Sequence, residues 1–145
     1  MKTIRTLVIC LLISVVPTVA KADLPIDRLE QITYTPKHTE CTSWLTLAFR
    51  LGWQRQNLPT LERVMWRESR CQPGVHNPKD PNGGSYGLTQ INGFWCRPTA
   101  WYPKGYLQHF GVVRVCADLF RPEQNLLAAL EVFNYSKGWT QWYLP

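Results

Sequence analysis

Four cysteines, Cys41, Cys71, Cys96 and Cys116, restrict the fold of this chain more than any other feature. An even set in a small exported domain predicts two disulfide bonds, which four cysteines can form in three pairings. If Cys41 begins one helix and Cys71 ends the next, an antiparallel pair of helices brings them together and leaves Cys96 for Cys116. We favour this pairing, although the spacing leaves the other two open. The fifth cysteine, Cys10, lies in the N-terminal apolar run described below.

Metal binding is the other common use of cysteines in a small domain. Metal sites need clustered Cys and His residues, such as Cys-x-x-Cys, and this chain has no such spacing. His38, His76 and His109 also stand apart from the cysteines. The sequence therefore predicts structural bridges, without a metal centre or a cofactor.

The first 22 residues have the pattern of a secretory signal. Lys2 and Arg5 precede an apolar run, and Ala20-Lys21-Ala22 offers a small-x-small cleavage site. A membrane anchor is the alternative, but Pro17 interrupts the run, which falls short of the roughly 20 residues that a spanning helix needs. We expect residues 1–22 to be removed and the mature chain to be exported, without an anchor, to the periplasm, the cell wall or the medium.

The charge of the mature chain limits its partners. Removing residues 1–22 lowers the formal net charge from +6 to +3, because three basic residues and no acidic residue are lost. The remaining Lys and Arg residues form no cluster, which argues against nucleic-acid binding. A mild positive charge suits an anionic surface such as a bacterial wall. The length of 145 residues corresponds to about one domain, which we expect to act as a monomer.

Helical spacing of apolar residues dominates the rest of the sequence. The segment "CTSWLTLAFRLGW" predicts a helix that stops at Gly52, and "PTLERVMWRESRC" predicts one that starts at Pro59 or Thr60. The segment "RPEQNLLAALEVFNYSKG" predicts a longer helix, with Pro122 near its start and Gly138 just past its end.

Between these helices lies a glycine-rich segment. We interpret "SYGLTQINGFW" as a brief helix that leaves a turn at Gly83 and Gly84. Alternating strand patterns are scarce, so the fold class is mainly α, with at most a small hairpin between residues 79 and 86.

One acidic residue stands on an apolar helix face. Leu61, Val64 and Met65 form one stripe, and Glu68, seven positions after Leu61, continues it. The acid is therefore expected to point inward. An apolar environment favours the protonated form of a carboxyl group, which is the form that a general acid needs. The alternative is a position at a frayed helix end or an ion pair with a neighbouring arginine: Arg63, Arg67 or Arg70.

The order of motifs resembles the soluble lytic transglycosylase and goose-type lysozyme superfamily. That pattern is a helix ending in Glu-Ser, a variable loop, a Gly-Ser-x-Gly-Leu-x-Gln segment and a later Ala-rich helix. Here the parts are Glu68-Ser69, "RCQPGVHNPKDPNG", "GSYGLTQIN" and "NLLAALEVFNYSKGW". The resemblance implies a lysozyme-like fold, with an N-terminal lead-in and first helix over residues 23–57 and the catalytic core over residues 58–145.

The resemblance also implies a groove for the N-acetylglucosamine and N-acetylmuramic acid strand of peptidoglycan. Carried over by position, Glu68 matches the catalytic acid, Ser85 the polar residue near the N-acetyl group and Gln90 a groove contact. Thr89 departs from the pattern, where Met is common, and we expect a change in packing there. Further candidate substrate-binding residues are Tyr86, Asn92 and Tyr135. Either Phe133 or Tyr135 could occupy the late-helix aromatic position.

Three functions remain open at this point. The resemblance favours a lytic transglycosylase, in which the sugar's own C6 hydroxyl attacks C1 and leaves a 1,6-anhydro end. A hydrolase that inverts needs a second carboxylate roughly 6.5–9.5 Å from the acid, for which Asp80 is the candidate. A secreted glycan-binding protein with an inert Glu68 is the third possibility. Most of the seven tryptophans are expected in the core.

Overall fold

The computed structural model describes residues 34–143. The predicted signal segment, with Cys10 and its cleavage site, lies outside the described residues. The described residues belong to one unit of the chain, Gln31–Pro145. They form a mainly helical fold with a small antiparallel sheet and two disulfides, as the sequence predicts.

The first two helices, α1 (Thr42–Arg50) and α2 (Leu58–Ser69), form the predicted pair. Helix α1 ends before Gly52, whose φ of 103° only glycine adopts without strain. Helix α2 begins one residue before Pro59, which occupies the first turn, where a missing N–H costs nothing. The disulfide between Cys41 and Cys71 joins the start of α1 to the end of α2, with the two Cα atoms 5.3 Å apart. The favoured pairing is therefore confirmed.

The glycine-rich segment is a β-structure, so the brief helix predicted for "SYGLTQINGFW" is wrong. The strands β1 (His76–Asn77), β2 (Ser85–Tyr86) and β3 (Ile91–Asn92) form an antiparallel sheet in the order β1-β2-β3. Gly87 and Gln90 have φ angles of 73° and 47°, which reverse the chain between β2 and β3 and cannot occur in a right-handed helix. A 3-10 helix follows at Gly93–Cys96.

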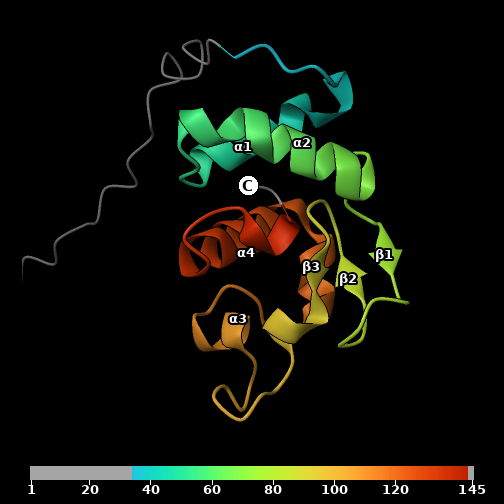
Figure 1. Ribbon diagram of the computed structural model, residues 1–145, viewed down its shortest axis with the longest axis vertical. Helices are drawn as coiled ribbons and strands as arrows, with labels where there is room; N and C mark the ends of the chain where they lie inside the picture. Colours follow the sequence, from blue (N-terminus) through green and yellow to red (C-terminus); the bar gives the residue numbers. More distant parts are fainter. Residues whose placement is uncertain (1–33, 144–145) are drawn as a thin grey trace, which may run out of the picture. The chain divides into compact units, whose positions relative to one another are not determined.

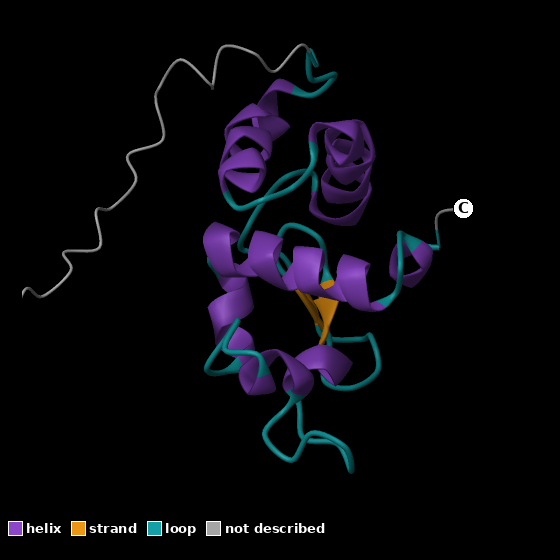
Figure 2. Ribbon diagram, turned by 90° about the vertical axis from the view of Figure 1, so that its left-hand side faces the viewer, coloured by secondary structure: helices purple, strands orange, loops and turns teal. Residues whose placement is uncertain are grey.

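The long helix α4 (Pro122–Tyr135) occupies the centre of the described unit. It lies between the α1–α2 pair and the segment that contains α3 (Tyr106–His109), as two views show (Figures 1 and 2). A second disulfide, Cys96–Cys116, closes the segment between β3 and α4. Within residues 34–143, none of the helices has the length and apolarity that crossing a membrane requires.

A buried asparagine joins α4 to the sheet. Asn125 is fully buried, and its Oδ1 accepts hydrogen bonds from the Thr89 backbone N–H (3.0 Å) and hydroxyl (2.8 Å). Its Nδ2 donates to the carbonyl oxygens of Tyr86 and Leu119, each at 2.9 Å. Thr89 is itself fully buried. The departure from Met at this position therefore belongs to the core, where the hydroxyl completes a polar network.

Asp118 organises the turn that leads into α4. Its carboxylate accepts hydrogen bonds from the backbone N–H groups of Arg114 (2.7 Å) and Val115 (3.2 Å), and it pairs with the Arg121 guanidinium at 2.9 Å. The pKa of this carboxyl lies below its usual value of 3.8, mainly because of the hydrogen bond from the Arg114 N–H. Burial acts in the opposite direction and raises the pKa. The Val115 N–H and the guanidinium of Arg121 lower it further.

We expect this carboxylate to make the fold sensitive to acid. A lowered pKa means that Asp118 contributes stability at pH values above its ordinary pKa, and that this contribution is lost as the pH falls through the lower folded value. An Asp118→Asn variant should therefore be less stable than the wild type at pH 6 and should lose less stability between pH 5 and pH 2. Urea unfolding at a series of pH values measures this, and parallel curves for the two proteins would contradict it.

Candidate active site

A polar pocket of about 460 Å3 lies where the end of α2, the sheet and the C-terminal segment meet. Four of the six predicted catalytic and substrate-binding residues line it: Glu68, Ser85, Gln90 and Asn92. We call this site the Glu68 pocket. The other main contributors are Asp80 from the β1–β2 loop, Phe94 and Trp95 after β3, and the C-terminal residues Gln141, Trp142 and Tyr143.

Glu68 lies in the last turn of α2. The three apolar residues of its stripe, Leu61, Val64 and Met65, are fully buried, whereas the Glu68 side chain is 25% exposed. Glu68 is seven positions after Leu61, which is about two helical turns, so both lie on nearly the same face of α2. Glu68 also lies at the end of the helix, where the pocket begins. The acid therefore faces a pocket instead of the core, and it forms the ion pair with Arg67 that was the alternative to an inward position.

Ser69 fixes the end of this helix against the sheet. Its buried hydroxyl lies 2.7 Å from the Leu88 carbonyl oxygen and 3.1 Å from that of Met65. The next two residues, Arg70 and Cys71, both have left-handed backbone angles, and their N–H groups bond back to the last turn of α2. The disulfide to Cys41 anchors this turn from the other side. Ser69 and the disulfide together hold Glu68 in place.

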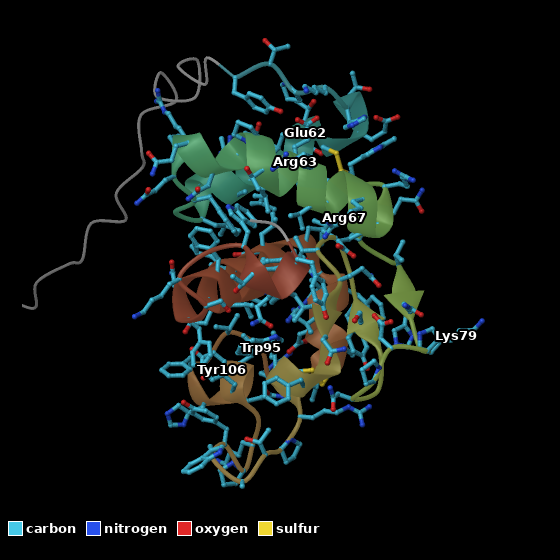
Figure 3. The ribbon with its side chains drawn as sticks, viewed as in Figure 1. Glu62, Arg63, Arg67, Lys79, Trp95 and Tyr106 are labelled. Atoms are coloured by element: carbon cyan, nitrogen blue, oxygen red, sulfur yellow. A yellow bond between two sulfur atoms is a disulfide. The ribbon has the colours of Figure 1, made fainter. Side chains whose placement is uncertain are left out.

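Arg67 contacts both the acid and the C-terminal segment. Its Nη2 donates to Glu68 Oε1 and to the Trp142 carbonyl oxygen, each at 2.6 Å. Figure 3 shows Arg67 near the end of α2, on the side toward the sheet. Trp142 is buried, and its indole N–H donates to the Thr89 carbonyl oxygen at 2.8 Å. These contacts make the C-terminal segment a wall of the pocket and use one of the two Glu68 oxygens.

The hairpin β2–β3 places Ser85 and Asn92 opposite each other. Asn92 is fully engaged: its Nδ2 donates to the Pro81 carbonyl oxygen at 3.0 Å, and its Oδ1 accepts from the Asn82 amide and the Phe94 backbone N–H. It thereby ties the β1–β2 loop to the sheet. Ser85 is buried, and its hydroxyl lies 3.4 Å from Asn92 Nδ2.

Gln90 presents an acceptor to the pocket. Its Nε2 donates to the carbonyl oxygens of Val75 (3.1 Å) and Gly87 (2.9 Å). These two contacts fix the orientation of the amide, because only its nitrogen can donate to a carbonyl oxygen. This leaves Oε1 as the atom of the amide that can accept a hydrogen bond, for example from the N–H of an acetamido group.

A second carboxylate, Asp80, lines the same pocket as Glu68. It lies in the loop between β1 and β2, and its Oδ1 accepts a hydrogen bond from Asn77 Nδ2 at 2.7 Å. The neighbouring Lys79 points away from the fold at the tip of this loop (Figure 3). Asp80 is thus a half-buried side chain at the pocket, where it could serve as a base for water.

The two tyrosines among the predicted contacts do not line the Glu68 pocket. Tyr86 is buried, donates its hydroxyl to the Gly83 carbonyl oxygen at 2.7 Å and stacks on His76. Tyr135 is exposed and lines a neighbouring pocket. Phe133 is partly buried and packs against Trp53 and Trp139, whereas Tyr135 lines that neighbouring pocket.

The buried acid of α2 is Glu62, which sequence reasoning missed. It is 2% exposed and accepts hydrogen bonds from the Tyr34 hydroxyl and from the His38 backbone N–H (2.6 Å). Burial and the bond to Glu62 raise the pKa of Tyr34 to about 12. Glu62 lies on the side of α2 toward the N-terminal segment (Figure 3). No sequence signal separates it from an exposed acid, because its partners lie more than 20 residues away.

The arrangement at the Glu68 pocket suits proton transfer next to a neutral, polar ligand. It offers a fixed carboxyl group, an amide oxygen and a serine hydroxyl in one concave site. Among residues 34–143, no group of three or more His, Cys, Asp or Glu residues could hold a metal ion.

Comparison with known proteins identifies a relationship over most of the chain. A family model described as the lysozyme-like domain matches residues 45–143, which include most of α1, the Glu68 pocket and α4. No curated protein matches the chain.

Proposed function

The chain belongs to the lysozyme-like domain family, and from this premise we propose that it is a lytic transglycosylase that acts on the glycan of peptidoglycan. Its substrate is the β-1,4 bond between N-acetylmuramic acid and N-acetylglucosamine. The observation that carries the proposal is the position of Glu68, which lies on the wall of a polar pocket together with Ser85 and Gln90.

The chemistry needs one carboxyl group in two successive roles. Protonated Glu68 donates its proton to the glycosidic oxygen as the C1–O bond breaks through an oxocarbenium-like state. The resulting carboxylate then takes the proton from the C6 hydroxyl of the same muramic acid ring, and the C6 oxygen forms a bond to C1. The products are a free 4-hydroxyl on the N-acetylglucosamine side and a 1,6-anhydro end, and Glu68 is protonated again.

The surrounding residues supply orientation. Gln90 Oε1 and the Ser85 hydroxyl are placed to hold an N-acetyl group beside Glu68. Arg67 occupies one oxygen of Glu68 and leaves Oε2 for the glycosidic oxygen. Because the nucleophile belongs to the same sugar ring as C1, its effective concentration is high without a second carboxylate.

Hydrolysis is the second candidate, and Asp80 is the observation that favours it. A carboxylate on the wall of the same pocket could activate a water molecule for attack on C1. The product would then carry a reducing end. A protein without a catalytic role would release no fragments at all.

The end group of the released fragments decides between these functions. We expect mass spectrometry of fragments from purified peptidoglycan to find 1,6-anhydro ends, one water lighter than reducing ends. An Asp80→Asn variant should give the same ends at a rate within about threefold, since the proposed mechanism uses one carboxyl group. Reducing ends that disappear in Asp80→Asn would show a hydrolase instead, and an absence of fragments from the wild type would show a binding protein.

Export of the mature chain is part of the same proposal. The two disulfides require an oxidising compartment to persist, and peptidoglycan lies outside the cytoplasmic membrane. The predicted signal at residues 1–22 provides the route. N-terminal sequencing of the mature protein tests it, with Asp23 expected as the first residue.

A further inference from the structure

The segment of residues 94–115 holds most of the exposed apolar side chains of the fold. Within residues 34–143, six large apolar side chains are exposed, and four of them lie in this segment: Phe94, Trp101, Phe110 and Val115. Trp101 is the extreme case, with 88% of its surface exposed to solvent. We call residues 94–115 the aromatic lobe. A group of exposed apolar side chains of this kind marks a surface that meets a partner or a membrane.

The aromatic rings of the lobe form one connected surface. Tyr106 packs against Tyr102, with ring centres 5.0 Å apart, and against Phe110, with ring centres 4.8 Å apart. Trp101 and Phe94 continue this surface, because they line the neighbouring pocket together with Tyr102 and Tyr106. Tyr106 is only 6% exposed. The exposed rings therefore rest on a packed base.

The base of the lobe is fixed to the rest of the fold. The Cys96–Cys116 disulfide joins the two ends of the lobe, with the Cα atoms 5.3 Å apart. Gln108 Nε2 donates to the Cys96 carbonyl oxygen at 2.6 Å, and the Tyr106 hydroxyl donates to Glu131 of α4 at 2.7 Å. The lobe lies on the side of α4 away from α1 and α2 (Figures 1 and 2). It is thus a separate, rigid end of the described unit.

The charge of the lobe has one sign. Its charged residues at pH 7 are Arg97, Lys104 and Arg114, all three exposed, and the lobe contains no acidic residue. Arg97 and Lys104 take part in none of the ion pairs within residues 34–143, and Arg114 only approaches Asp118, at 3.9 Å. The lobe therefore presents positive charge beside its exposed rings, without acidic groups of its own to balance it.

Basic side chains next to exposed rings fit the surface of an anionic membrane. Anionic headgroups attract each nearby Lys or Arg by about fivefold in affinity. Trp and Tyr rings favour the boundary between the headgroups and the acyl chains. The core of a protein–protein interface has a different composition, because lysine is depleted there. A membrane surface accounts for both features of the lobe at once.

We propose that the aromatic lobe docks the exported protein on a surface of anionic phospholipids. Trp101 and Phe110 enter the headgroup region, and Arg97 and Lys104 contact the lipid phosphates. The docking is reversible, since it uses exposed side chains of a folded domain. It does not depend on the proposed function, because it needs neither a glycan nor Glu68.

Docking has a consequence for the proposed function. Phe94 and Trp95 line both the neighbouring pocket and the Glu68 pocket, so the lobe and the candidate active site are adjacent. A protein held by its lobe therefore keeps the Glu68 pocket close to the membrane. Cleavage then takes place in the glycan layer nearest to the membrane.

Vesicle binding by the mature protein tests the docking. We expect vesicles of equal parts phosphatidylglycerol and phosphatidylcholine to bind it about 100-fold more tightly than phosphatidylcholine alone, and about 1 M salt to remove most of this difference. Trp101→Ala and Lys104→Glu should each weaken binding about tenfold. The matched controls are Tyr143→Ala, at a 95% exposed ring outside the lobe, and Arg50→Glu, at an exposed base of α1. Each control should change binding less than twofold.

Three outcomes would overturn the docking. The first is equal binding to anionic and neutral vesicles, and the second is an equal loss in the lobe variants and their controls. The third is binding to neither kind of vesicle, which would assign the lobe to a protein or a wall polymer. The assay contains no glycan, so a protein that releases no fragments from peptidoglycan can still pass it. Trp101 and Lys104 are exposed, so their variants are expected to fold, and unchanged melting temperatures check this.

Discussion

Replacing Glu68 by Gln is expected to lower the rate of glycan cleavage by about 10²–10⁴-fold while the protein remains folded. The amide has the shape of the acid but cannot give a proton to the glycosidic oxygen or take one from the C6 hydroxyl, so both steps of the mechanism fail. The exposed ion pair with Arg67 is lost as well, at a cost of about 0–1 kcal/mol in unfolding free energy. Fragment release per unit time, measured by chromatography of digested peptidoglycan, gives the rate.

The chain offers a matched control for this substitution. Glu123 is an exposed acid in the first turn of α4 and lines neither pocket, so Glu123→Gln makes the same chemical change away from the site. We expect its rate to stay within about twofold of the wild type. If Glu68→Gln also keeps its rate at an unchanged melting temperature, Glu68 is not the acid and the proposed mechanism is wrong.

The second large effect concerns stability, because Asn125→Ala should lower the free energy of unfolding by about 3–4 kcal/mol. The substitution removes the partner of four buried groups: the N–H and hydroxyl of Thr89 and the carbonyl oxygens of Tyr86 and Leu119. Each buried group left without a hydrogen bond costs about 1–3 kcal/mol. Rearrangement of the site, or a water molecule that enters it, recovers part of the summed cost. Urea unfolding followed by tryptophan fluorescence measures the loss.

Asn134→Ala controls for the difference in helix propensity. Asn134 lies in the same helix, α4, but is exposed. Its replacement by Ala should change the free energy of unfolding by less than about 0.7 kcal/mol, in the stabilising direction. Similar effects of the two substitutions would mean that the network around Asn125 contributes nothing. The hairpin turn at Thr89 also carries Gln90, so Asn125→Ala should weaken substrate binding in the protein that remains folded.

Local patterns in the sequence were enough to predict most of the helices, and the family resemblance implied the groove. The bounds of α1, α2 and α4 follow from apolar spacing, from prolines at helix starts and from glycines past helix ends. The order of the first two helices favoured the disulfide pairing that the structure shows, although the sequence left two other pairings open. Four of the six predicted catalytic and binding residues line one pocket because the motif spacing places the end of α2 against the hairpin.

The remaining features depend on partners that are distant in the sequence. The segment "SYGLTQIN" is a hairpin instead of the predicted brief helix, and contacts with Asn125 and Val75 hold the turn in which Gly87 and Gln90 have left-handed angles. Glu62 is buried because Tyr34 and His38 fold back over α2. Trp142 becomes a pocket wall through bonds to Thr89 and Arg67. Hydrophobic periodicity contains no information on such pairs.

The pairing of the cysteines also has a consequence for how the chain can mature. Each disulfide joins two cysteines that follow one another among the four described cysteines, so the two covalent loops, of sequence separation 30 and 20, do not overlap. A chain that enters an oxidising compartment with its N-terminus first can close the Cys41–Cys71 loop before Cys96 arrives. Correct pairing then needs only an oxidant that joins the cysteines in the order in which they enter the compartment. The protein should therefore form its native disulfides without a catalyst that rearranges wrong ones.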